Sequence, residues 1–141
     1  MKQEEKELLI KDLCARLPYG VKAFVKNWSN LERIWIEGIY TIKSIYPSVD
    51  SIFVSSNMGS VEVIVEDDDY KIKPYLFPMS SMTEEQRNEY HELLYNPKHG
   101  IDIDYFDWCH KNHLDCRCLI KKGLALDATN LNIDYGSKNK M

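Results

Sequence analysis

The residues best suited to chemistry lie close together near the C-terminal end of the chain. The stretch from Cys109 to Cys118 holds three cysteines and two histidines. Thiolates and imidazoles are the ligands that Zn²⁺ prefers in proteins. Cys109 and His113 are four residues apart and would share one face of a helix, and Cys116 and Cys118 could complete a tetrahedral site beyond its end. A zinc site formed by these four residues is therefore one hypothesis.

The spacing of the same residues argues against zinc. The pattern C-x3-H-x2-C-x-C matches no standard zinc signature. Free cysteine is among the most buried residue types, so Cys109 and Cys118 are explained equally well as small core residues. We therefore predict no cofactor, and we keep a zinc-binding module or a metal-dependent enzyme centred on residues 109–118 as the alternative.

Other catalytic arrangements are weaker. The two neighbouring histidines could pair with carboxylates, but aspartates are also typical of helix starts; the candidates are Asp102, Asp104 and Asp107. Cys109 and His110 are adjacent, and adjacent residues of a helix point apart, so they cannot form a nucleophile–base pair there. The sequence contains no phosphate-binding loop, dinucleotide fingerprint or Gly-x-Ser-x-Gly elbow. We predict no catalytic residues and lean towards a protein that is not an enzyme.

Composition and charge disfavour several classes of protein. The chain has 141 residues, of which 44% are apolar and 28% charged, as in an ordinary globular domain. Its formal net charge is −4, whereas nucleic-acid binders usually carry a basic stripe that neutralises phosphates. Nucleic-acid binding through a sheet face is a further alternative, which needs a basic surface assembled from Lys22, Lys26, Arg33 and Lys43.

The sequence also predicts a compartment. Residues 1–7 are charged and acidic overall, unlike a signal peptide. No apolar run is long enough to span a membrane. We therefore expect no membrane association and a location in the cytoplasm, where the four cysteines would be reduced thiols.

Two periodicities divide the chain. Apolar residues recur at helical spacing over residues 3–16, which predicts an amphipathic helix. From Val21 the period changes to two, and turn signals separate about five short strands. Gly38 predicts a bulge or sharp bend in the longest strand, over residues 33–46.

The second half of the chain is predicted to be helical. Prolines at positions 74 and 78 mark the change. Thr83 and Gln86 fit a capping box that starts a helix running to about residue 95. Apolar bulk and a candidate aspartate cap predict a further helix over about residues 104–112.

These elements predict an α+β fold. It consists of a small five-stranded antiparallel sheet or SH3-like barrel, an N-terminal helix and two C-terminal helices, and closing the sheet would remove its edges. We expect a single domain over residues 1–128, with a β-rich part at 19–76 and a helical part at 82–128. A loose polar tail is expected at 129–141. The apolar residues around the two prolines should seat the helices on the sheet.

Aromatic residues are the remaining candidates for a binding surface. Trp28 lies in a polar turn, and Trp35 alternates with isoleucines, so one face of its strand must be less buried. Aromatic-lined grooves of small barrels bind peptides or partner strands, although large rings also dominate cores. The predicted binding residues are Trp28, Trp35, Tyr75 and Phe77, and the expected partner is a protein.

Three runs of the sequence resemble a family of small proteins encoded in gut Bacteroidales genomes and in their phages or mobile elements. The runs are KDLCARLPYGV at 11–21, IKPYLFPMSSMT at 72–83 and GLAL at 123–126, and the resemblance extends from residue 8 to about residue 128. The family pattern has a histidine near His113 but no match to Cys116 and Cys118, which further weakens the zinc hypothesis.

The resemblance implies a setting, the cytoplasm of a bacterial host, and no activity. Together with the weak catalytic candidates, it leads us to predict a non-catalytic binding or accessory protein of a phage or mobile element. Such a protein would act through protein–protein contacts, and inhibition of host defence is one role it could have. The sequence predicts neither the identity of the partner nor the oligomeric state.

Overall fold

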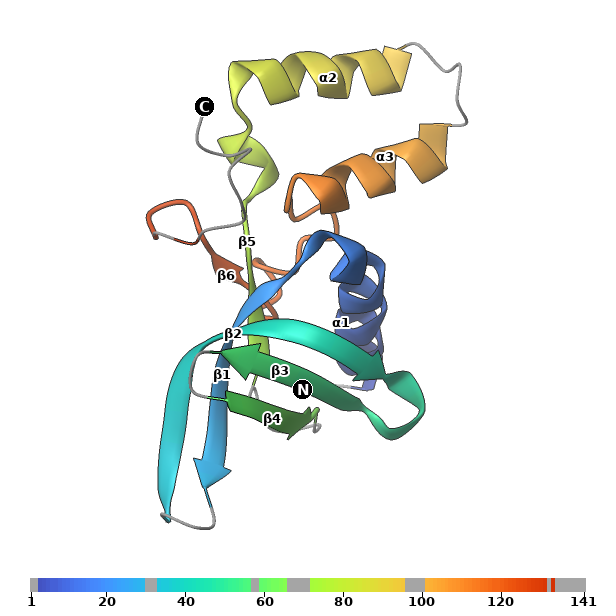
Figure 1. Ribbon diagram of the computed structural model, residues 1–141. Helices are drawn as coiled ribbons and strands as arrows, with labels where there is room; N and C mark the ends of the chain where they lie inside the picture. Colours follow the sequence, from blue (N-terminus) through green and yellow to red (C-terminus); the bar gives the residue numbers. More distant parts are fainter. Residues whose placement is uncertain are drawn as a thin grey trace.

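The chain folds as an α+β protein with an N-terminal helix, a mixed sheet, and two helices placed between the last two strands of the sequence (Figure 1). The computed structural model describes residues 3–29, 33–56, 59–65, 72–95, 101–131 and 133, without the side chains of 27–29, 34–36, 94 and 101–104. The elements are α1 (Gln3–Arg16), β1 (Lys22–Ser29), β2 (Ile34–Tyr46), β3 (Ser51–Ser56), β4 (Gly59–Ile64), β5 (Ile72–Leu76), α2 (Glu84–Tyr95), α3 (Ile101–Lys111) and β6 (Leu126–Asp127).

The described residues form one six-stranded sheet in the order β4-β3-β2-β1-β5-β6. Neighbouring strands are antiparallel from β4 to β5, and the two-residue β6 adds to β5 in parallel. Because β4 and β6 are separate edges in the described part of the chain, the sheet does not close. The predicted α+β class and N-terminal helix are therefore confirmed, whereas the SH3-like barrel and the antiparallel five-stranded sheet are wrong, because the described sheet is open, six-stranded and mixed.

The longest strand, β2, curves strongly across the sheet (Figure 1). The predicted bulge at Gly38 is wrong, because Gly38 pairs in regular register with Val25 of β1. The register of β2 with β3 shifts instead between Ile42 and Ser44. The extra residue of β2 between these two positions is Lys43, so the bulge lies further along the strand than the predicted Gly38. A bulge of this kind adds local twist to its strand.

Helix α1 lies beside the sheet and contributes to its hydrophobic core. Leu9 and Leu13, one turn apart on α1, are fully buried. They pack with every second residue of the strands, as expected for a sheet with one buried face. The core also includes residues of the turns near the C-terminus. Its members besides the two leucines include Ala23, Val25, Ile42, Ile52, Val54, Val63, Ile72, Leu119 and Leu124.

Helices α2 and α3 stack at one end of the molecule, beyond the end of β5 (Figure 1). The capping box of α2 is confirmed: the Gln86 amide donates to Oγ1 of Thr83 at 3.1 Å, and the Thr83 amide donates to Oε1 of Gln86 at 3.0 Å. Tyr90 and Trp108 join the two helices, with ring centroids 6.0 Å apart. Helix α3 begins three residues before the predicted start, at Ile101, and also contacts α1.

The segment after β5 fastens the C-terminal half to the sheet. The amide of Phe77 donates to the carbonyl of His113 at 2.9 Å, and its carbonyl accepts from the amide of Asp115 at 2.8 Å. The carbonyl of Leu76 accepts from the amide of Ala128 at 2.9 Å. Residues 76–77 therefore lie between two returning segments, which agrees with the predicted role of this stretch in seating the helices.

The predicted tail lies mostly outside the described residues; residues 129–131 are exposed, and residue 133 is half-buried. In the described part of the chain, none of the helices has the length and apolar character needed to cross a membrane.

Candidate functional site

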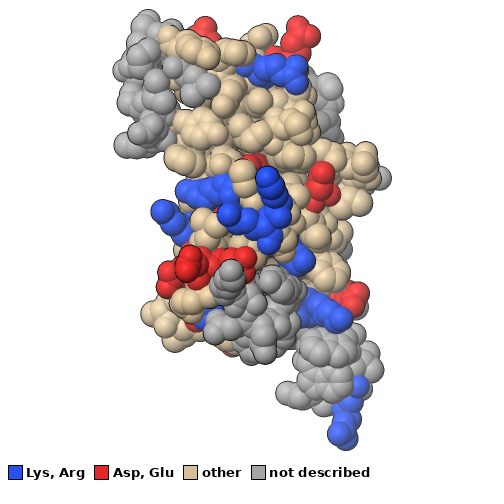
Figure 2. Space-filling model, turned by 180° about the vertical axis from the view of Figure 1, so that it is seen from behind, with Lys and Arg blue, Asp and Glu red and all other residues tan. Residues whose placement is uncertain are grey.

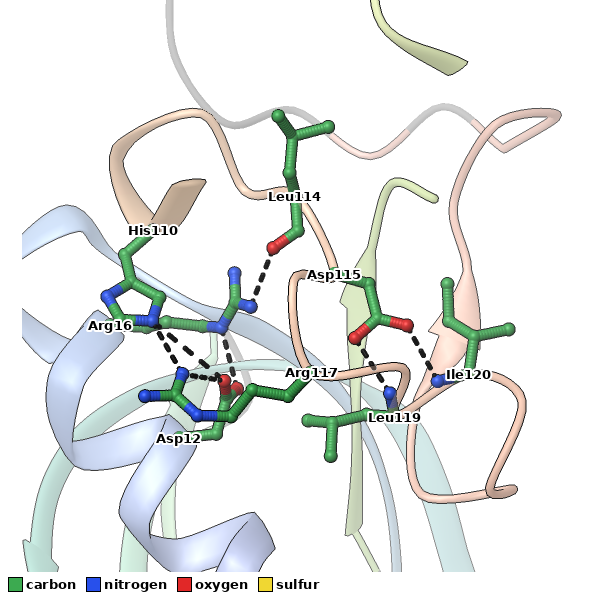
Figure 3. A network of polar contacts seen from close by, with 8 residues as sticks. All are labelled: Asp12, Arg16, His110, Leu114, Asp115, Arg117, Leu119 and Ile120. Atoms are coloured by element: carbon green, nitrogen blue, oxygen red, sulfur yellow. Dashed lines mark hydrogen bonds and ion pairs between the residues drawn. The ribbon is translucent and has the colours of Figure 1, made fainter. Parts of the chain in front are cut away.

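A cluster of charged side chains is buried between α1 and the turn that follows α3 (Figure 3). Asp12 and Arg16, one turn apart on α1, are fully buried. Nε of Arg16 donates to one carboxylate oxygen of Asp12 at 2.6 Å, and Nη1 of Arg117 donates to the other at 2.9 Å. Asp12 thus binds two guanidinium groups, one of them from the far end of the chain.

Arg16 also ties α1 to the backbone of the turn. Its Nη2 donates to the carbonyl of Leu114 at 2.7 Å. Buried charges are stable only when they are paired and hydrogen-bonded, and most of the Arg16 guanidinium meets this condition. Its Nη1 is buried and has no hydrogen-bond partner among the described residues. One strong donor therefore remains inside the cluster.

His110 of α3 completes the cluster. Its Nε2 lies 2.8 Å from Nη1 of Arg117. Arginine can only donate, so Nε2 must accept, and the ring proton of His110 lies on Nδ1. Phe106, one helical turn earlier, stacks on His110 with ring centroids 6.4 Å apart. The guanidinium carbon of Arg117 lies over the ring of Phe106, 4.8 Å from its centroid. These contacts fix the orientation of the imidazole.

The cluster contains more positive than negative charge. Two arginines face the single carboxylate of Asp12. The nearby Asp115 is engaged elsewhere, because its two oxygens accept from the amides of Leu119 and Ile120 at 2.8 and 2.9 Å (Figure 3). An additional anion beside the arginines would therefore be stabilised.

Two cysteines lie against this cluster. Cys109 is buried at the end of α3, and Cys116 is half-buried in the turn. A hydrogen bond from the Cys109 thiol, aided by His110 and Arg16, lowers the pKa of Cys116 to about 5 in spite of its partial burial. The same hydrogen bond, together with desolvation, raises the pKa of Cys109. Within the pair, these contacts favour the negative charge on Cys116 over Cys109.

The four predicted zinc ligands are not brought together as a set. Helix α3 ends at Lys111 and His113 has a positive φ of 59°, so Cys109 and His113 do not share a helix face as the spacing suggested. Cys109 and Cys116 interact, whereas Cys118 is exposed. Across the residues that the structure describes, no group of three or more His, Cys, Asp or Glu is arranged to hold a metal ion.

The predicted aromatic binding residues have different surroundings. Trp28 lies in β1 rather than in a turn and pairs in register with Trp35 of β2, but both side chains lie outside the described residues. Tyr75 is 6% exposed, and Phe77 is half-buried. Tyr75 is therefore buried, and Phe77 is only partly accessible.

A different group of apolar side chains stands on the outward face of β2, β3 and β4. Tyr46, Ser51 and Ile64 lie opposite one another on the three strands. Tyr46 is 50%, Ile64 40% and Phe53 37% exposed, and the rings of Tyr46 and Phe53 meet edge to face with centroids 5.7 Å apart. In the described part of the chain no helix covers this face (Figure 1). We call Tyr46, Phe53, Ile64 and the adjoining exposed Val49 the sheet patch.

Sequence reasoning missed the sheet patch, although a signal for it exists. Phe53 stands between Ile52 and Val54, and Ile64 between Val63 and Val65. A strand with one solvated face alternates apolar and polar residues, so three apolar residues in a row place one of them on the outward face. The flanking residues are buried, and the middle ones are exposed.

The described basic residues lie beside acidic ones rather than in a continuous stripe. Nζ of Lys26 in β1 lies 3.8 Å from Oε1 of Glu37, the residue opposite it in β2. On the rear face of the molecule, Figure 2 shows a central group of Lys and Arg side chains bordered by acidic side chains. A surface of mixed sign offers little support for nucleic-acid binding, which depends on a continuous basic footprint.

No model of a protein family, no curated protein and no solved structure matches the chain. Two features of the described residues bear on function: the sheet patch, and the thiol pair beside the buried charge cluster.

Proposed function

We propose that the protein is a non-catalytic binding protein that contacts a protein partner through the sheet patch. The observation that carries this proposal is the exposure of large apolar side chains on three adjacent strands. Contiguous apolar groups on the surface of a soluble protein commonly mark interaction sites. Aromatic side chains at the centre of such a patch usually supply most of the binding energy.

The sheet patch suits binding because its side chains are already held in place. Tyr46 and Phe53 contact each other across paired strands. Between them and Ile64, the buried hydroxyl of Ser51 donates to the carboxylate of Glu62. A surface that needs little ordering loses little conformational entropy when a partner binds.

The setting implied by the family resemblance indicates the source of the partner. A protein of a phage or mobile element meets the proteins of its bacterial host, so we expect the partner to be a host protein. Inhibition of host defence is one consequence that such a contact could have. The apolar patch indicates a partner that offers apolar side chains of its own.

Affinity capture from a Bacteroidales lysate, quantified by mass spectrometry, tests the proposal. The baits are the full chain, Phe53→Glu, Ile64→Glu and the control Leu131→Glu. Leu131 is 48% exposed and lies outside the sheet patch. We expect the unaltered chain and the control to retain the same host protein, and both patch variants to lose it, with circular dichroism showing that all four chains are folded.

Two results would overturn the proposal. One is a set of retained proteins that does not change between the patch variants and the control. The other is a chain that retains nothing but dimerises in size-exclusion chromatography through the patch, because the partner would then be a second copy of the chain.

A further inference from the structure

We propose that Cys116 is an oxidation site: a hydroperoxide oxidises its sulfur, and Cys109 then closes a disulfide with it. This modification site is separate from the sheet patch and does not depend on the proposed binding function.

The first support is the path of the chain at the end of α3. The carbonyl of Cys109 accepts from the amide of Leu114 at 2.9 Å, and the carbonyl of Leu114 accepts from the amide of Cys116 at 3.1 Å. The chain therefore turns back after α3 and returns Cys116 to Cys109. The two side chains are in contact through a hydrogen bond between their thiols.

The second support is the unused donor of Arg16. Its Nη1 is buried and lacks a hydrogen-bond partner in the described part of the chain, while its charge favours the thiolate of both cysteines. Asp12 already binds Arg16 and Arg117. A thiolate on Cys116 would supply the missing negative charge beside the two arginines.

The other groups around the pair agree with a thiolate on Cys116. His110 carries its proton on Nδ1, which is the donor left for its hydrogen bond to Cys116. Tyr105 is neutral, because burial and the neighbouring Cys109 raise its pKa. Asp115 is occupied by two backbone amides.

Exposure sets the order of the two cysteines. Cys116 is half-buried and can meet a small oxidant, whereas Cys109 is fully buried. The thiolate is the reactive form of cysteine, so Cys116 reacts first and Cys109 acts as the resolving thiol. Cys14 is more exposed, but partial burial raises its pKa.

The chemistry balances in two steps. The Cys116 thiolate attacks one oxygen of the hydroperoxide, the O–O bond breaks, and the leaving oxygen departs as hydroxide or alkoxide and takes up a proton. Cys116 is thereby oxidised to a sulfenic acid and the peroxide is reduced. The sulfur of Cys109 then attacks the sulfenic sulfur; the S–S bond forms, the S–O bond breaks, and the proton of Cys109 leaves with the hydroxide as water.

Peptide mapping after limited treatment with hydrogen peroxide at pH 7 tests the proposal. Trypsin cleaves after Arg16, Lys111, Arg117 and Lys121, so each of the four cysteines lies on a different peptide. We expect Cys116 to be consumed at least about tenfold faster than Cys14 or Cys118. The product should be a disulfide between the peptide ending at Lys111 and the peptide ending at Arg117.

Two variants keep the test decisive. Cys14→Ser/Cys118→Ser alters only exposed thiols and should form the same disulfide at the same rate. Cys109→Ser should stop at the sulfenic acid of Cys116, which dimedone traps. Equal consumption of the four thiols would overturn the proposal, and so would a product in which Cys116 pairs with Cys118 or Cys14.

Discussion

At the scale of single residues, the buried charge cluster shows where pattern reasoning fails. Asp12 lies among the lysines and glutamates of α1, where the sequence predicts a solvent-exposed side chain. Charged residues are also seldom fully buried. It is buried because Arg117, 105 positions further along the chain, binds it. The thiols of Cys109 and Cys116 could be counted from the sequence, but their pairing depends on the turn after α3 and could not.

Removing the charge of Asp12 should destabilise the fold strongly. Asp12→Asn keeps the size of the side chain but leaves two arginines, Arg16 and Arg117, without their carboxylate partner. Breaking one partner of a buried ion pair costs about 3–5 kcal/mol. Urea unfolding measures this loss.

An exposed ion pair provides the matched control. Lys26 and Glu37 are each about half exposed, and disrupting such a pair changes stability by about 0–1 kcal/mol. Glu37→Gln should therefore alter the free energy of unfolding far less than Asp12→Asn. Equal losses in the two variants would show that the cluster does not hold α1 to the turn.

The lowered pKa of Cys116 predicts a pH dependence of stability. Its value falls from the ordinary 9.0 to about 5 on folding, so between these values the unfolded state binds more protons, and the free energy of unfolding rises with pH. The gain is complete above pH 9 and is lost as the pH falls through 5. The raised pKa of Cys109 acts in the opposite direction only above its ordinary value of 9.0.

Urea unfolding under reducing conditions at several pH values between 5 and 8 measures this effect. Cys116→Ser should show a flatter rise of stability with pH than the unaltered chain, whereas Cys14→Ser should keep the full rise. Parallel curves for all three chains would contradict the assignment of the thiolate to Cys116.

At the scale of elements, local signals were sufficient where the interaction itself is local. Helix α1 and the capping box of α2 were predicted because their apolar period and cap residues lie within a few positions of one another. The bulge at Lys43 was not predicted, because it depends on how β2 pairs with β3. The early start of α3 was missed because sequence reasoning used its aspartates as caps.

The cap of α2 is testable by itself. Thr83→Ala removes the side-chain oxygen that accepts from the Gln86 amide and should lower stability by about 1 kcal/mol. Thr83→Ser retains the hydroxyl and should restore most of it, as measured by thermal or urea unfolding. A serine variant as unstable as the alanine variant would show that the hydroxyl does not cap the helix.

The two faces of β3 should respond differently to truncation. Ile52 is fully buried, so Ile52→Ala should cost about 2–5 kcal/mol. Phe53, its neighbour on the outward face, mainly contacts Tyr46, and Phe53→Ala should cost about 1 kcal/mol or less. The reverse order in urea unfolding would mean that the strand presents the opposite face to the core.

At the scale of the whole molecule, the fold class followed from the sequence, but closure of the sheet did not. Two periodicities separated by prolines specify a sheet and helices, whereas the partner of each edge strand is decided by segments far apart in the chain. The same limit applies to function. The position of the helices decides which apolar residues of the sheet stay exposed. The sheet patch could therefore be identified only from the structure, in which α1 packs on the opposite face of the sheet.

The most direct test of the binding proposal is the dissociation constant of the captured partner for the unaltered chain, Phe53→Glu and Leu131→Glu, measured by titration calorimetry. A central aromatic residue contributes about 2 kcal/mol or more to an interface, so Phe53→Glu should weaken binding by at least about 30-fold. Leu131→Glu should stay within about twofold, as expected for a surface change outside the interface. A folded Phe53→Glu chain that binds with the affinity of the unaltered chain would contradict the account.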